Sequence, residues 1–291
     1  MNSIEVLDAG PLTTVQDLGR PGLAALGVGQ SGAADVAAMR LANRLVGNAE
    51  RAATLEVTFG GLQLRAHGGA WVSVTGAPCP MSVGGRAVAP YSVFWVPDGD
   101  VLRLGLPTTG LRSYLAVRGG VEVRPVIDSR STDTLSAVGP APLAAGDRLE
   151  IGHRQAALLS VDVAPVRQPA AGDLRLRVVL GPRDDWFTGD ARRALLGEPY
   201  EVTAESNRIG MRLGGTPLAR SRTEELPSEG MVCGALQVPP SGQPTLFLAD
   251  HPVTGGYPVI AVVVAADIGL AAQARPGQRL FFTEVKGPDL G

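Results

Sequence analysis

Pairs of glycines that separate short, β-like runs are the feature that most constrains this chain. Residues 81–83 and 86–88 flank Gly84-Gly85, the strongest hairpin signal in the sequence, and Gly60-Gly61 separates two further runs. Glycine allows the positive φ angles that tight turns need. Short strands joined by such turns favour a barrel or sandwich over alternating strands and helices. The sequence therefore predicts a mainly β protein with few short helices.

A recurring turn-and-strand pattern and one linker divide the chain into two halves. The pattern joins a tight turn to a half-buried strand, and it occurs at residues 97–105, 144–152 and 275–282. Its irregular spacing excludes a solenoid. The best linker, rich in Pro, Ala and Gln, covers residues 165–172. We therefore expect two mostly β halves, at residues 1–165 and 173–291.

Two helices and one buried strand stand out from the remaining pattern. An apolar stripe over residues 36–46 predicts a helix that Ser31 or Gly32 caps and that Gly47-Asn48 ends, and a shorter helix is expected at residues 190–196. Residues 259–266 are β-branched and apolar almost throughout, which is typical of a strand covered on both faces.

Composition excludes several classes of protein. The net charge of −2 gives no indication of a nucleic acid or membrane partner, and the longest uncharged apolar run, residues 258–266, is too short to span a bilayer. The start of the chain lacks a secretory signal, so a soluble cytoplasmic protein is expected. Lys286 is the only lysine, which excludes a P-loop. His67, His153 and His251 have no partner at metal-ligand spacing.

The loop before the buried strand carries the densest chemistry. Residues 249–258 place an acid, an imidazole, a hydroxyl and a phenol around a glycine pair, in Asp250, His251, Thr254, Gly255-Gly256 and Tyr257. Reactive groups on a loop at the end of a rigid strand are typical of binding and catalytic sites. The alternative is a hairpin turn whose polar residues are solvated. Asp and His suit proton transfer.

Other polar clusters lie in loops rich in glycine and proline. They are Asp17 beside Gln16 and Arg20, Ser31 with Asp35, the run Ser129, Arg130 and Ser131, the pair Arg208 and Arg212, then Ser228 and Gln237. Arginine and hydroxyl groups suit carboxylate or phosphoryl oxygens. The glycines around the two arginines favour an extended loop over a helix that would place both on one face. Each cluster taken singly could equally be structural.

The order of the motifs resembles a known family. The motifs are TTVQDLGRPG (13–22), GVGQSGAAD (27–35), LANRLVGN (41–48), RSYLAVRGG (112–120), SRST (129–132), NRIGMRL (207–213), GALQVP (234–239) and DHPVTGGYP (250–258). With them the chain resembles the allophanate hydrolase subunit 2 family, also called the KipA or biotin-dependent carboxyltransferase-like family. The resemblance implies two tandem cyclophilin-like β-barrel halves. It also implies a subunit 1 (KipI-like) partner on a separate chain.

Three functions are compatible with this resemblance. In the first, the chain, its subunit 1 partner and the A subunit of a 5-oxoprolinase open the lactam of 5-oxoproline, using ATP bound by the complex to phosphorylate the amide oxygen. In the second, it transfers a carboxyl group from carboxybiotin held by another protein. In the third, it is a KipA-like regulator that sequesters an inhibitor of a histidine kinase.

The resemblance and the polar clusters together give an expected set of site residues. The residues assigned to catalysis are Asp250, His251 and Arg208. Those assigned to substrate binding are Arg212, Gln237, Ser228, Thr254, Gly255, Gly256, Tyr257, Asp17, Ser31, Asp35, Ser129, Arg130 and Ser131. In this hypothesis the arginines bind anionic oxygens, Asp250 with His251 positions water or moves protons, and Gln237 hydrogen-bonds the amide or lactam.

Overall fold

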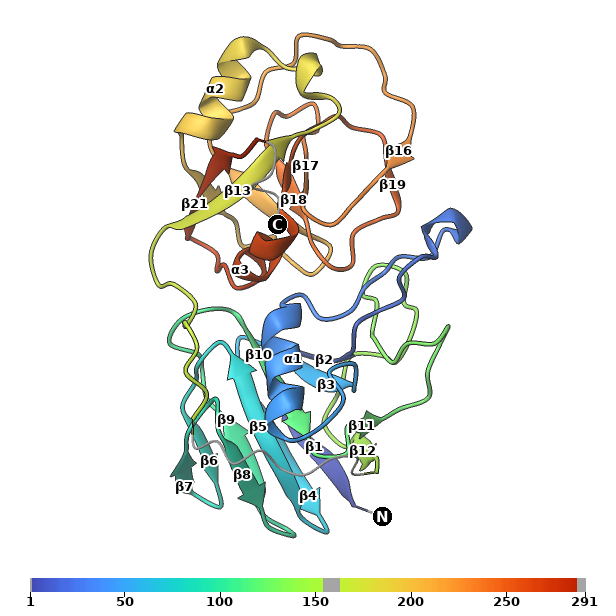
Figure 1. Cartoon of the computed structure of the whole chain (residues 1–291), viewed down its shortest axis with the longest axis vertical. Coiled ribbons are helices and arrows are strands. Elements are labelled where there is room, and N and C mark those ends of the chain that lie inside the picture. The colour runs from blue at the N-terminus through green and yellow to red at the C-terminus, as the bar shows by residue number, and fades with distance from the viewer. Residues whose placement is uncertain (1, 154–162, 287–291) are drawn as a thin grey trace. The chain divides into compact units, whose positions relative to one another are not determined.

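The chain forms two compact units, which a computed structural model describes over residues 2–153 and 163–286 (Figure 1). Unit 1 comprises Met1–Arg20, Ser31–Asp133 and Ala137–Pro169, and unit 2 comprises Pro21–Gln30, Thr134–Ser136 and Ala170–Gly291. The predicted linker contains the step from Pro169 to Ala170 at which the chain passes from one unit to the other. Two short segments from the N-terminal part of the chain also belong to unit 2, which is therefore discontinuous in sequence.

Unit 1 is built from two antiparallel sheets. The seven-stranded sheet contains, in spatial order, β11 (Val121–Glu122), β12 (Arg148–Ile151), β1 (Ser3–Ala9), β4 (Leu62–His67), β9 (Val101–Leu104), β6 (Met81–Val83) and β7 (Arg86–Val88). The five-stranded sheet contains β2 (Leu12–Gln16), β3 (Thr54–Thr58), β10 (Arg112–Val117), β5 (Ala70–Gly76) and β8 (Val93–Val96). The hairpin predicted at Gly84-Gly85 is confirmed, because Val83 pairs with Arg86. Both glycines have positive φ, at 54° and 83°, as a two-residue hairpin turn of this hand requires.

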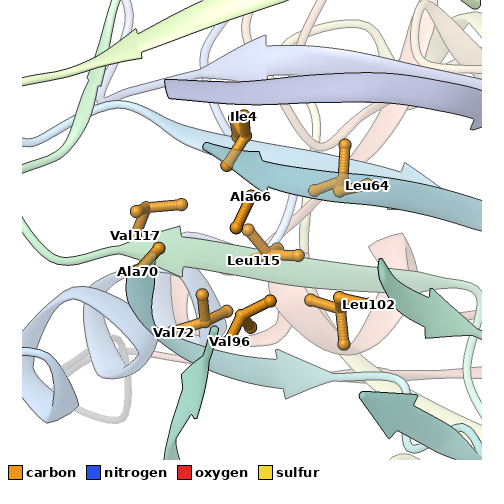
Figure 2. Close-up of a pocket in the computed structure, with 9 residues that line it drawn as sticks. All are labelled: Ile4, Leu64, Ala66, Ala70, Val72, Val96, Leu102, Leu115 and Val117. Carbon is orange, nitrogen blue, oxygen red and sulfur yellow. The ribbon is translucent and has the colours of Figure 1, made fainter. Parts of the chain in front are cut away.

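The core of unit 1 lies between its two sheets. Apolar side chains from β1, β4 and β9 of one sheet meet those of β3, β5 and β10 of the other in one continuous cluster. A cavity of about 10 Å³ lies inside this cluster. Figure 2 shows the nine apolar side chains that line it. A buried water needs two or more polar partners, which this lining does not offer. The cavity is therefore a gap in core packing and not a ligand site.

Helix α1 (Val36–Leu45) covers the outer face of the five-stranded sheet and confirms the predicted helix, but its cap is Asp35 and not Ser31 or Gly32. It begins where the Asp35 side chain accepts a hydrogen bond from the Ala38 N–H, which satisfies one of the unpaired donors of the first turn. Its buried face, with Met39 and Ala42, packs on Tyr114 and Ala116 of β10. The intervening β10 residues face the inter-sheet core, so every residue of this strand is buried.

Unit 2 is a closed seven-stranded barrel. Its strands, in spatial order, are β13 (Leu174–Leu180), β20 (Val259–Val263), β17 (Ala235–Gln237), β18 (Thr245–Phe247), β15 (Gly210–Gly214), β14 (Tyr200–Val202) and β21 (Arg279–Glu284). The barrel closes where β13 and β21 pair in parallel. Its interior is filled by apolar side chains, among them Leu176, Tyr200 and Phe282. A separate two-stranded ribbon joins β16 (Glu229–Gly230) to β19 (Thr254–Gly255).

Short helical segments accompany the barrel. They are η1 (Ala24–Leu26), η2 (Asp184–Trp186), α2 (Gly189–Gly197), η3 (Ala265–Asp267) and α3 (Ile268–Ala272). Helix α2 confirms the prediction for residues 190–196. The predicted strand over 259–266 is too long, because β20 ends at Val263 and the chain turns into η3. The turn forms because the Asp267 carboxylate accepts hydrogen bonds from the backbone N–H and the guanidinium of Arg177 on β13.

The expectation of a mainly β chain with few short helices and barrel architecture is confirmed. Strand pairing dominates both units, and the longest helix is α1 with 10 residues. Across residues 2–153 and 163–286, no helix is long and apolar enough to cross a membrane.

Candidate functional site

Arg208 and Asp250 form a buried ion pair in unit 2. Arg208 lies just before β15 and Asp250 three residues after β18. Nε of Arg208 donates to Oδ2 of Asp250 and Nη2 donates to Oδ1, both at 2.9 Å. The Asp250 N–H also donates to the Arg208 carbonyl at 3.0 Å. The side chains are 1% and 0% exposed, so the pair faces the interior and fixes two loops to each other.

Thr134 is a further partner of Asp250. It belongs to the short Thr134–Ser136 segment of unit 2 and donates to Oδ2 of Asp250 from its N–H at 3.0 Å and its hydroxyl at 2.6 Å. Because these four groups all donate to it, the Asp250 carboxylate acts as a hydrogen-bond acceptor. Sequence reasoning missed Thr134, although it lies only two residues beyond the Ser129–Thr132 run that was singled out.

The loop after Asp250 is tied to the β16–β19 ribbon. Gly255 pairs with Glu229 in this ribbon, so Thr254 and Gly255 lie beside β16. Ser228, which directly precedes β16, is exposed. The half-buried His251 has Nδ1 at 2.8 Å from the Pro252 carbonyl, and its ring lies 6.3 Å from that of Phe247. A carbonyl can only accept, so Nδ1 is the donor in this contact.

Gln237 holds the backbone of the same loop through a hydrogen bond. Its Nε2 donates to the Tyr257 carbonyl at 3.1 Å, at the end of β17. A Cβ at position 255 would lie 2.5 Å from this Nε2, so a larger residue there would displace the amide from its present position. Gly256 and Tyr257 remain exposed. The predicted loop residues and Gln237 are therefore brought together in one region of unit 2.

Arg212 does not join the Arg208–Asp250 pair. It lies on β15, so the segment is extended, and the alternative of a helix with both arginines on one face does not form. Its exposed side chain donates from Nη1 to the Thr245 hydroxyl at 3.0 Å on the neighbouring strand.

A second group of predicted residues surrounds the buried Asp17 in unit 1. Oδ1 of Asp17 accepts from the hydroxyls of Ser129 and Ser131, both at 2.6 Å, and Oδ2 accepts from the Arg130 N–H at 2.7 Å. The Arg130 guanidinium points elsewhere and pairs with Glu122 at 2.5 Å. These contacts tie the segment after β2 to residues 129–131, which gives Asp17 a clear role in holding the two segments together.

Ser31 and Asp35 stand at the entrance to α1 in the same unit. Ser31 has a positive φ of 54°, and its hydroxyl donates to the Thr132 carbonyl at 2.9 Å. The Asp35 side chain caps α1, while its N–H donates to the Tyr114 hydroxyl at 2.7 Å. Their described contacts are consistent with shaping this turn.

A buried acid next to them was missed by sequence reasoning. Glu56 on β3 accepts from the Tyr114 hydroxyl at 2.7 Å and from the Ala34 N–H at 2.9 Å, and it lies 3.5 Å from Arg112. Burial, followed by the nearby Glu56 charge, raises the pKa of Tyr114 well above its usual value. The available signal was a single charged residue in the β-like run Thr54–Thr58.

The described residues offer hydrogen-bonding and proton-transfer groups rather than a metal centre. Within residues 2–153 and 163–286, no group of three or more His, Cys, Asp or Glu side chains is placed to hold a metal ion. In unit 2 the His251 imidazole, the Gln237 amide and the exposed Tyr257 gather around a backbone that the Arg208–Asp250 pair fixes. Such a set can bind a small polar molecule and move a proton.

Known proteins are similar to this chain over nearly its whole length. Residues 26–284 match the family described as carboxyltransferase domain, subdomain A and B. The C subunit of 5-oxoprolinase from Escherichia coli (strain K12) is 38% identical over 284 residues, which cover 97% of this chain and 91% of that protein. The crystal structure of TTHA0988 has a TM-score of 0.87 at 37% identity, over 97% of this chain and 55% of that one. That of the K. lactis urea amidolyase has a TM-score of 0.92 at 29% identity, over 98% of this chain and 19% of that one.

Proposed function

Because this chain belongs to the carboxyltransferase domain family with subdomains A and B, we propose that it is one component of an enzyme that hydrolyses a small cyclic amide. The substrate we propose is 5-oxoproline, which is opened to glutamate. The similarity to the C subunit of a 5-oxoprolinase carries this proposal, because it extends over nearly all of both chains. The similarity to urea amidolyase involves a small part of a much longer protein.

The exposed part of the loop after Asp250 would contact the substrate. Arg208 and Asp250 are too deeply buried to touch it, so in this proposal they position the loop. His251 is the proton-transfer group, because the Pro252 carbonyl orients the imidazole through Nδ1 and leaves Nε2 for the substrate. Gln237 holds the loop backbone at Tyr257 and keeps the region in the shape that substrate requires.

ATP would be bound by other chains of the complex. A triphosphate needs a backbone cradle with a lysine or several free arginines, and this sequence has no P-loop motif. Arg208 is engaged by Asp250, and the Arg130 guanidinium by Glu122. The two arginines expected to bind phosphoryl oxygens are thus already paired with carboxylates, which supports an ATP site on another chain. We place ATP on a subunit 1 (KipI-like) partner or on the A subunit of the 5-oxoprolinase, and the part of this chain is to bind and orient the lactam.

A carboxyltransferase is the second candidate. The match to a family of carboxyltransferase domains and the high TM-score with urea amidolyase favour it. In that case the same loop would receive carboxybiotin carried by another protein. The two candidates differ in the dependence on biotin, which makes them easy to separate.

The test is a reconstituted assay with the purified chain and the proteins encoded beside it. Lactam hydrolysis predicts glutamate formation from 5-oxoproline that requires ATP and is insensitive to avidin. A carboxyltransferase predicts activity that requires a biotinylated carrier and is abolished by avidin. If the chain binds a KipI-like protein and neither activity is found, the regulatory function is favoured instead.

A further inference from the structure

Arg220 lies beside the exposed end of the candidate loop and was not among the residues expected from the sequence. It forms an isolated bridge with Phe187, and its guanidinium lies 5.7 Å from the centre of the Tyr257 ring. Nη2 donates to the carbonyl of Val238, the residue that follows Gln237. Arg220 thus contacts the loop at the same place that Gln237 supports.

The charge of Arg220 has no counter-ion in the described part of the chain. Its contacts there are the Val238 carbonyl and the Tyr257 ring, neither of which carries a negative charge. Nε is buried and has no hydrogen-bond acceptor. Burial lowers the pKa of Arg220, yet arginine stays protonated at neutral pH. A partly buried cation without an anion is unfavourable and calls for a partner that the chain does not supply.

Arg222, two residues away, is an arginine of the same segment whose charge is paired with a carboxylate. It also lies 5.7 Å from the centre of an aromatic ring, that of Trp186. In contrast to Arg220, it pairs with the Asp185 carboxylate at 2.7 Å. Arg183 is likewise bound to Glu229. The absence of a carboxylate at Arg220 is therefore a feature of this position and not of the segment.

We propose that Arg220 and Tyr257 form a recognition site for the carboxylate of a small-molecule ligand. Tyr257 is 44% exposed, so a ligand can reach this end of the loop from solvent. A carboxylate matches the planar guanidinium fork and supplies the missing negative charge. The identity of the ligand rests on the proposed function, since 5-oxoproline carries a carboxylate beside its lactam. Its ring amide would then lie toward the part of the loop held by Gln237.

Isothermal titration calorimetry on the full chain tests this site with 5-oxoproline and with 2-pyrrolidinone, the same lactam without a carboxylate. The variants are Arg220→Gln, Arg220→Lys and, as the matched control, Arg222→Gln. We expect Arg220→Gln to weaken 5-oxoproline binding at least tenfold and to leave 2-pyrrolidinone unaffected. Arg220→Lys keeps the charge without the fork and should give an intermediate loss. Arg222→Gln should bind like the unsubstituted chain.

The other outcomes separate this site from the proposed function. The site would be overturned if Arg220→Gln weakened the binding of 5-oxoproline and 2-pyrrolidinone equally. It would also be overturned if Arg220→Gln had no effect, or if no carboxylate bound in a way that depends on Arg220. Binding of inorganic phosphate through Arg220 in place of carboxylates would overturn it too. If Arg220 is needed to bind acetate or glutarate but 5-oxoproline does not bind, the carboxylate site stands and the proposed substrate is wrong. Thermal unfolding of each variant shows whether the fold is intact, and Arg220→Lys replaces Arg220→Gln if the latter does not fold.

Discussion

Arg208 and Asp250 show that burial can give a structural role to a polar pair expected to act in catalysis. The sequence indicates that both are important, because they lie in loops crowded with glycine and polar groups. They are separated by 42 residues, and no local pattern shows that each satisfies the other. Burial of a charge is tolerated only when it is paired and hydrogen-bonded, so the pair is first of all a structural requirement.

Removal of one member should therefore destabilise the protein. We expect Arg208→Ala to reduce the free energy of unfolding by about 3–5 kcal/mol, since it leaves the Asp250 charge buried without its main partner. The control is Arg212→Ala, an exposed arginine four residues away that donates to Thr245, which should change stability by no more than about 0.5 kcal/mol. Urea unfolding of the two variants measures the difference. Equal stabilities would show that the ion pair has no structural role.

The two cysteines are expected to be chemically inert in the native protein. Burial raises the pKa of Cys79 to about 11, although its hydrogen bond with Ser113 acts in the opposite direction. Burial likewise raises the pKa of Cys233 to about 11. Alkylation needs the thiolate. At about pH 8, below both raised values, iodoacetamide should label neither residue in the folded chain and both after unfolding in urea. Rapid labelling of the folded chain would contradict this account.

Single residues in unit 1 show the limit of sequence reasoning at this scale. Asp17, Ser129 and Ser131 were all singled out from their loops, but their separation by 112 and 114 residues concealed that they form one cluster. Glu56 was missed because strand patterns treat a polar residue as solvent-facing. Here the segment that leads into α1 lies over that face, and Tyr114, Arg112 and the Ala34 N–H satisfy the carboxylate.

Secondary-structure elements were predicted well where local chemistry determines them. The Gly84-Gly85 hairpin and helix α1 follow from turn glycines and from an apolar stripe with a glycine stop, and both occur as expected. The strand predicted over residues 259–266 is longer than the observed β20, which ends at Val263. Its end involves a side chain that is distant in the sequence. Arg177 on β13 binds Asp267, 90 residues away, and this contact turns the chain into η3.

The Arg177–Asp267 contact gives the barrel a measurable dependence on pH. Burial of Asp267 opposes ionisation, but the hydrogen bonds and charge of Arg177 outweigh it and lower the pKa of Asp267 below its usual value. Its contribution to stability is therefore present above about pH 4 and is lost as the pH falls through the lowered value. Asp267→Asn should cost about 1 kcal/mol at neutral pH, since Arg177 is 41% exposed and solvent weakens the pair.

Urea unfolding at about pH 7 and at about pH 3.5 tests this prediction. The difference between Asp267→Asn and the unsubstituted chain should shrink at the lower pH. The control is Asp173→Asn, which removes the exposed pair with Arg279 at the other end of β13 and should have little effect at either pH. A difference that grows on acidification would contradict the lowered pKa.

For the whole molecule, the sequence predicted two β-rich parts and a connection near residues 165–172. It gave no sign that Pro21–Gln30 and Thr134–Ser136 belong to the unit formed by the C-terminal residues. The reason is physical: these segments have little regular structure, and the hydrogen bonds from Thr134 to Asp250 connect residues 116 apart.

This discontinuity predicts how the C-terminal part behaves in isolation. A fragment of residues 170–291 lacks Thr134 and leaves Asp250 with fewer donors, so it should be less stable than the same unit in the full chain. In the full chain, Thr134→Val should reproduce part of this loss, by about 1–2 kcal/mol. Hydrogen exchange of the β17 and β20 amides measures the stability of the barrel in all three proteins. Equal protection would show that the Thr134 segment contributes nothing.

The most direct test of the central claim is an omission assay with the complete set of neighbouring proteins. Glutamate and ADP are measured together while this chain is left out, added back, or replaced by Arg220→Gln. A component of a lactam hydrolase predicts that both products form in equal amounts only when the chain is present, and that Arg220→Gln raises KM for 5-oxoproline. Equal glutamate formation with and without the chain would contradict the proposed function.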